Sequence, residues 1–188
     1  MSENLIKSIL IAALIFVLSA GAGAGLIIQD PTIGESFMQV LTEALDLEVL
    51  MEQTPIMLAA MLFVNNLQAC ILLFLGGVTF GILTIFVLAT NGIVVGAVVQ
   101  MANEMQGITY VVAALLPHGI FELPALFIAG GLGLMLAGAI RRELYEDGDA
   151  AADARQYTVF FAKTVLPLLV LAAITEAFIT PGIIVLVV

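Results

Sequence analysis

The chain alternates long apolar runs with short polar segments. A helix needs about 20 mostly apolar residues to cross a bilayer. Runs of about this length predict five membrane-spanning helices, at residues 5–28, 56–75, 77–99, 108–140 and 159–187. We therefore expect one all-α integral membrane domain covering residues 1–188, a polytopic helical bundle with broken or re-entrant segments.

Composition supports this fold class and excludes several others. The chain is 62% hydrophobic and 11% charged, whereas soluble domains are about 45–50% apolar and about 25% charged. The chain has 15 acidic and 5 basic residues. This acidic excess disfavours nucleic-acid binding and electrostatic docking on anionic lipid. The acidity fits either a halophile or an ordinary set of acidic loops. Because Cys70 is the single cysteine, an intramolecular disulfide is excluded.

The first polar segment, residues 31–54, mixes acidic side chains with apolar ones at roughly helical spacing. This spacing predicts one interfacial amphipathic helix on the extracytoplasmic membrane face, with a solvated acidic linker as the alternative. The small residues that follow the first apolar run also permit a signal peptide. A retained first helix is favoured because the apolar run resumes at Leu26.

Glycine and proline mark the expected breaks and packing faces. Two GxxxG pairs suit close helix packing, and three residues between 117 and 124 interrupt the fourth span. This interruption makes the segment either a re-entrant half-helix or a kinked helix. Pro181 should kink or end the last span. The expected packing and break positions are Gly77, Gly81, Gly92, Gly96, Pro117, Gly119, Pro124 and Pro181.

The basic residues predict the orientation. Lys7 lies near the N-terminus, and the other four lie around a loop at 141–158: Arg141, Arg142, Arg155 and Lys163. The positive-inside rule places both regions in the cytoplasm. The four crossings expected between them satisfy this requirement, so we expect a multi-pass cell-membrane protein with a cytoplasmic N-terminus and an extracytoplasmic C-terminus.

Six polar residues fall inside the apolar runs: Asn65, Asn66, Asn91, His118, Glu122 and Glu176. A charge at mid-membrane costs about 2.5–3.5 kcal/mol on insertion scales, so these side chains should face protein or water. We predict an intramembrane polar cluster that is either structural or a ligand or ion site. The asparagines are expected to bridge helices rather than to bind a ligand.

Two of these candidates, the His118–Glu122 pair and Glu176, each have two interpretations. His118 and Glu122 are four residues apart, so on a helix they would share one face and could share a proton, or they could satisfy backbone groups freed at Pro117. Glu176 could bond backbone beside Pro181 or titrate as a desolvated carboxylate. With one histidine and no HExxH motif, the sequence supplies no metal site, catalytic set or cofactor motif.

An ordered set of short motifs resembles the stage II sporulation protein M family of integral membrane proteins. The motifs are FVNN at 63–66, GGVTFG at 76–81, NGIVVG at 91–96, LLPHGIFELPALFIAGGLG at 115–133 and EAFITP at 176–181. In spore-forming bacteria the namesake takes part in engulfment with cell-wall hydrolases. The family also reaches archaea that lack peptidoglycan.

The resemblance implies a non-enzymatic scaffold or organiser in membrane or envelope remodelling. Its expected partners are the lipid bilayer, a second copy of the chain and other membrane or envelope proteins. The alternative is a small transporter or channel, because broken helices around ionisable groups are how carriers build a site. An intramembrane hydrolase is a third hypothesis, which the thin His118–Glu122 pair supports poorly.

Overall fold

The computed structural model describes residues 2–30, 32–34 and 54–187, and these residues are helical apart from short turns. The expected amphipathic helix at 31–54 falls largely outside this description. The elements are α1 (Ser2–Gln29), α4 (Pro55–Leu75), the 3₁₀ turn η1 (Gly76–Thr79), α5 (Ile82–Tyr145), α6 (Ala150–Ile174), the π-helical turn η2 (Thr175–Ile179) and α7 (Thr180–Val187).

Five helical stretches are long and apolar enough to cross a membrane, which confirms the predicted fold class. They are Glu3–Gln29, Pro55–Thr79, Ile82–Pro117, Gly119–Tyr145 and Ala150–Leu186. The third and fourth stretches both belong to α5, and the backbone itself reverses at a point inside the third.

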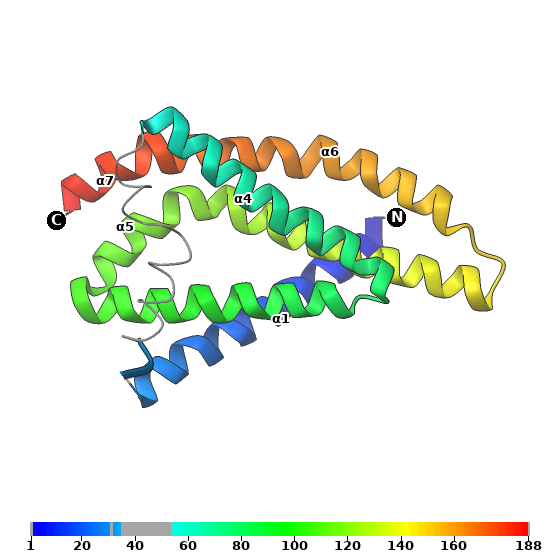
Figure 1. Ribbon diagram of the computed structural model, residues 1–188, viewed down its shortest axis with the longest axis horizontal. Helices are drawn as coiled ribbons and strands as arrows, with labels where there is room; N and C mark the ends of the chain where they lie inside the picture. The colour runs from blue at the N-terminus through cyan, green and yellow to red at the C-terminus, as the bar shows by residue number, and fades with distance from the viewer. Residues whose placement is uncertain (1, 31, 35–53, 188) are drawn as a thin grey trace.

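The reversal of α5 occurs at Gly107, whose φ of 82° and ψ of 168° lie outside the helical region. Glycine tolerates this backbone conformation, and a residue with a Cβ does so only under strain. Figure 1 shows α5 folding back on itself, so one element supplies two passes, a first leg at 82–106 and a second leg at 108–145. Helix continues through the polar residues 100–106, which the sequence had suggested as the end of a span.

The break expected at 117–124 is not an unwound segment. Pro117 and Pro124 both lie inside α5, and the backbone between them is helical. Each proline removes one backbone hydrogen bond and bends a helix without necessarily ending it. The structure therefore has continuous helix across this stretch rather than a break in the backbone.

The cytoplasmic loop expected at 141–158 is also much shorter in the structure. α5 continues to Tyr145 and α6 starts at Ala150, so only residues 146–149 connect them. The Asp149 side chain accepts a hydrogen bond from the backbone N–H of Ala152 at 2.9 Å and caps α6. The alanine-rich sequence after Asp149 favours helix even where it is too polar to lie within the membrane.

α5 is the central element, and it contacts α1, α4, α6, η1 and α7. The stretch Gly119–Tyr145 of its second leg is the most enclosed of the five candidate spans. The largest fully buried apolar side chains come from α4, both legs of α5 and α6: Leu73, Leu88, Leu132, Val165 and Leu169.

Glycines bring backbones into contact at two crossings. A Cβ at Gly96 on the first leg of α5 would overlap the carbonyl oxygen of Ala20 on α1. On the second leg, a Cβ at Gly133 would overlap the carbonyl oxygen of Leu73 on α4. The neighbouring Gly92 and Gly77 lie at the same two crossings, against Phe16 and Gly133. By contrast, a Cβ at Gly119 would meet nothing within 4 Å.

The turn that leads into α5 also depends on glycine. Phe80 and Gly81 both have positive φ, at 55° and 84°, and a left-handed backbone favours glycine. Here Gly81 serves as the left-handed N-cap of α5. The sequence had assigned it to a GxxxG packing pair.

The helices run roughly alongside one another, with the ends of the passes gathered at the two ends of the molecule. The N-terminus and the α5–α6 connection lie toward one end, whereas the α5 reversal and the C-terminus lie toward the other (Figure 1). The first end also holds two close ion pairs, Lys7–Glu3 at 2.7 Å and Arg142–Asp153 at 2.9 Å. An even number of passes separates the basic residues at this end, as the positive-inside rule requires. A cytoplasmic location of this end remains a prediction.

Candidate functional site

Three of the six predicted polar residues line one small cavity inside the bundle. Asn66 comes from α4, Glu122 from the second leg of α5, and Glu176 from η2. The cavity has a volume of about 140 Å³ and is completed by Leu62, Ala172 and Ala173. Residues far apart in the sequence therefore form one intramembrane polar site between three helical segments.

Glu176 is positioned by a local change of helix type. Residues 175–179 form a π-helical turn, in which the backbone N–H of Thr180 bonds to the carbonyl of Thr175. The Thr180 hydroxyl donates to the same carbonyl at 3.3 Å. Pro181 follows and has no N–H to donate to the preceding turn. Single π-helical turns inside α-helices are frequently found at functional sites.

Small side chains make room for the two carboxyl groups. Ala172 and Ala173 are buried and lie four and three residues before Glu176 in a continuous helical segment. A larger residue at either position would occupy the space that the cavity now holds. Glu122 lies between Pro117 and Pro124 of α5, and Glu176 lies in the π-helical turn.

Two carboxyl groups and an amide can hold a proton, a small cation or water, and they can also tie helices together. Glu122 and Glu176 each make a polar interaction. Desolvation disfavours an ionised carboxylate unless such partners offset it. Within the described ranges, no group of three or more His, Cys, Asp or Glu side chains is placed to hold a metal ion.

The other three predicted residues do not belong to this cavity as described. Asn65 precedes Asn66 on α4 but its side chain is exposed on the outer surface of the bundle. Asn91 was expected to bridge helices, yet its amide donates to the Val87 carbonyl of its own helix at 2.8 Å. The side chain of His118 lies outside the described residues, so its pairing with Glu122 stays a prediction.

Two polar features were missed by the sequence analysis. Thr84 is fully buried, and its hydroxyl donates to the Leu73 carbonyl at 2.8 Å, which ties α5 to the end of α4. Gln68 is exposed on α4, three residues after Asn65. The three-residue spacing of these two amides was a usable signal, because it places both on one helix face.

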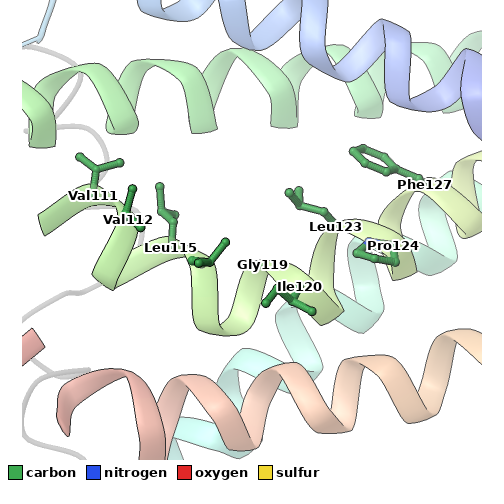
Figure 2. Close-up of a pocket in the computed structure, with 9 residues that line it drawn as sticks. Val111, Val112, Leu115, Gly119, Ile120, Leu123, Pro124 and Phe127 are labelled. Carbon is green, nitrogen blue, oxygen red and sulfur yellow. The ribbon is translucent and has the colours of Figure 1, made fainter. Parts of the chain in front are cut away.

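A second, larger cavity is apolar. It measures about 490 Å³ and is lined entirely by α5 residues between Val111 and Phe127. Figure 2 shows Val111, Leu115, Leu123 and Phe127 pointing to the same side of this stretch of helix. The lining offers no acid–base or nucleophilic group, so this cavity suits hydrocarbon rather than chemistry.

Comparisons with known proteins give a consistent result. Residues 12–181 match the family model of stage II sporulation protein M. The chain is 31% identical over 124 residues to an uncharacterized protein of Methanocaldococcus jannaschii, an alignment that covers 63% of this chain and 68% of that protein. No solved structure matches the chain.

Proposed function

Because the chain belongs to the stage II sporulation protein M family, we propose that it is a non-enzymatic organiser of membrane or cell-envelope remodelling. In this proposal the bundle works by associating laterally with other proteins inside the bilayer. Family membership supports a role in membrane or cell-envelope remodelling, and one feature of the outer surface supports lateral association.

That feature is a pair of exposed amides on α4. Asn65 is the middle residue of this 21-residue helix, about 15 Å from either end, and Gln68 lies about 5 Å farther along. Both side chains are exposed, and no described residue hydrogen-bonds to either. An amide left unsatisfied in hydrocarbon costs several kcal/mol, so a partner that hydrogen-bonds to this face is strongly favoured.

The interior of the bundle supports the same proposal. Backbone contact at Gly96 and Gly133 fixes α1 and α4 against α5. Such close crossings leave little freedom for the helices to slide. A rigid bundle can hold its outer face in a constant orientation toward a partner.

The proposal is tested with a photo-cross-linking residue placed at Ile71 of α4, which is 39% exposed and three residues from Gln68, in native membranes, so that both amides stay in place. A matched control carries the same residue at Leu14, which is 58% exposed on the apolar part of the outer face of α1. We expect adducts to identified membrane or envelope proteins, including copies of this chain, from position 71 and far fewer from position 14. Equal labelling at the two positions, or none at either, would overturn the proposal.

A second candidate function is a proton- or cation-coupled carrier, which the cavity of Asn66, Glu122 and Glu176 favours. Carriers place ionisable groups at helix irregularities near the bilayer midplane. The test is flux of protons and small cations into vesicles that contain the purified protein. Flux that is abolished by Glu122→Gln and by Glu176→Gln would support a carrier, and no flux above empty vesicles would reject it.

A further inference from the structure

We propose that two copies of this chain pair through the outer face of α4, with Gln68 in the contact seam and Asn65 beside it. This inference rests on the proposed function and names its partner as a second copy. The contact surface consists of exposed positions on α4, which we call the α4 seam: Met57, Met61, Val64, Gln68, Ile71 and Leu75.

The spacing of the α4 seam is the first argument. Its members recur at intervals of four and three residues along the whole of α4. Such a repeat, with mostly apolar members, allows two helices to pack along a continuous left-handed crossing. The opposite face of α4 is buried inside the bundle through Cys70, Leu73 and Phe74. The seam is therefore a packing surface that this chain leaves uncovered.

The chemistry of Gln68 and Asn65 is the second argument. A side-chain amide carries both a donor and an acceptor, so it can hydrogen-bond to an identical group. A two-fold interface places each residue opposite or near its own counterpart. Exposed carboxylates in the seam would repel one another in this arrangement, whereas amides attract, and no charged residue occurs between Pro55 and Gln100.

Membrane geometry is the third argument. Two copies inserted with the same orientation place Gln68 at the same depth in each, so a two-fold axis along the membrane normal brings the paired side chains together. A single polar residue in an apolar seam also fixes register and the number of helices. The outer face of α1 has no such feature, because its exposed residues from Leu10 to Leu26 are apolar or glycine.

The experiment uses single added cysteines in the full chain, oxidised in native membranes. Val64→Cys lies in the seam and replaces a residue that is 49% exposed, whereas Leu14→Cys is the control on α1. The chain without an added cysteine is a further control, because Cys70 is 1% exposed. We expect a disulfide-linked dimer from Val64→Cys alone. Linkage from both positions equally, or from neither, would overturn the inference.

The role of the amides is tested by adding Asn65→Leu and Gln68→Leu to the Val64→Cys chain. Leucine keeps the face apolar and similar in size, so the α4 seam still packs while its hydrogen bonds are lost. We expect about a tenfold weaker dimer and an unchanged monomer melting temperature. A dimer as strong as that of the parent would overturn the proposed role of the amides.

The outcomes also distinguish the pairing of two copies from the proposed organiser function. If position 71 photo-cross-links to another membrane protein while Val64→Cys gives no self-linked dimer, the pairing of copies is wrong and the organiser proposal stands. If position 71 gives no specific adduct and Val64→Cys gives no dimer, both fail. Two chains with different affinity tags, co-expressed and co-purified in mild detergent, provide the independent check.

Discussion

At the scale of single residues, glycines and buried polar groups control how closely these helices approach. Gly96 lets the first leg of α5 touch the backbone of α1, and the Thr84 hydroxyl ties α5 to the last turn of α4. Each effect depends on a single atom at a helix crossing, the absent Cβ of Gly96 and the hydroxyl oxygen of Thr84. They are therefore testable with the smallest substitutions available.

Gly96→Ala should destabilise the bundle by about 1–3 kcal/mol, because the added methyl group would overlap the Ala20 carbonyl and force the helices apart. The matched control is Gly21→Ala on α1, where a Cβ meets nothing within 4 Å. This control should be neutral or slightly stabilising, since alanine favours helix. Thermal unfolding in detergent measures both, and equal melting temperatures would contradict the packing assigned to Gly96.

Glu176 is predicted to need a polar side chain rather than a charge for folding. It makes a polar interaction and lines the cavity between α4, α5 and η2. Glutamine keeps a polar side chain at this position, whereas leucine does not. Glu176→Leu should lower the yield of folded protein, while Glu176→Gln should keep it near that of the parent. Size-exclusion chromatography in detergent measures the yield. A leucine variant that folds as well as the glutamine variant would contradict this role.

At the scale of elements, α5 decides the architecture because one helix element supplies two of the five passes. The reversal at Gly107 separates its legs, and the second leg continues as helix through both prolines. On the last pass, the π-helical turn contains Glu176, which lines the cavity. One departure from regular α-helix thus lies at the polar site.

Gly107→Ala should impair folding by about 1–3 kcal/mol, because its φ of 82° and extended ψ are strained for any residue with a Cβ. Gly119→Ala is the control, because its surroundings are equally open but its backbone is helical. Thermal unfolding in detergent again measures the difference. A Gly107→Ala chain as stable as the Gly119→Ala chain would show that the reversal does not depend on glycine.

The sequence predicts where the helices are better than it predicts which face of each helix packs inside the bundle. Hydrophobic run length gave five helices, and the polar stretch before Ile108 lay next to the true reversal. Pro117 and Pro124 left a re-entrant and a continuous helix open, and the backbone there is helical, because neighbouring helices can hold a proline-containing helix together. Asn65 and Asn66 look alike in the sequence, yet one is exposed and the other lines the cavity. That difference is set by how α4 packs on α5, which short motifs do not encode.

At the scale of the whole molecule, five passes put the two chain ends at opposite ends of the bundle. We predict that the end bearing Lys7, Arg142 and the 146–149 connection faces the cytoplasm, since basic residues are retained there. Cysteines placed at Ser2 and Gly148 should be protected from an impermeant thiol reagent in intact cells and labelled after lysis. A cysteine at Gly182, near the other end, should label in intact cells. The opposite pattern would reverse the orientation.

The central claim is that the protein acts by pairing in the bilayer through the amide-bearing face of α4. Subunit counting by single-molecule photobleaching in native membranes tests this claim most directly. We expect two bleaching steps for the parent chain and mainly one for the chain carrying both Asn65→Leu and Gln68→Leu. Single-step bleaching of the parent, or two steps for both chains, would contradict it.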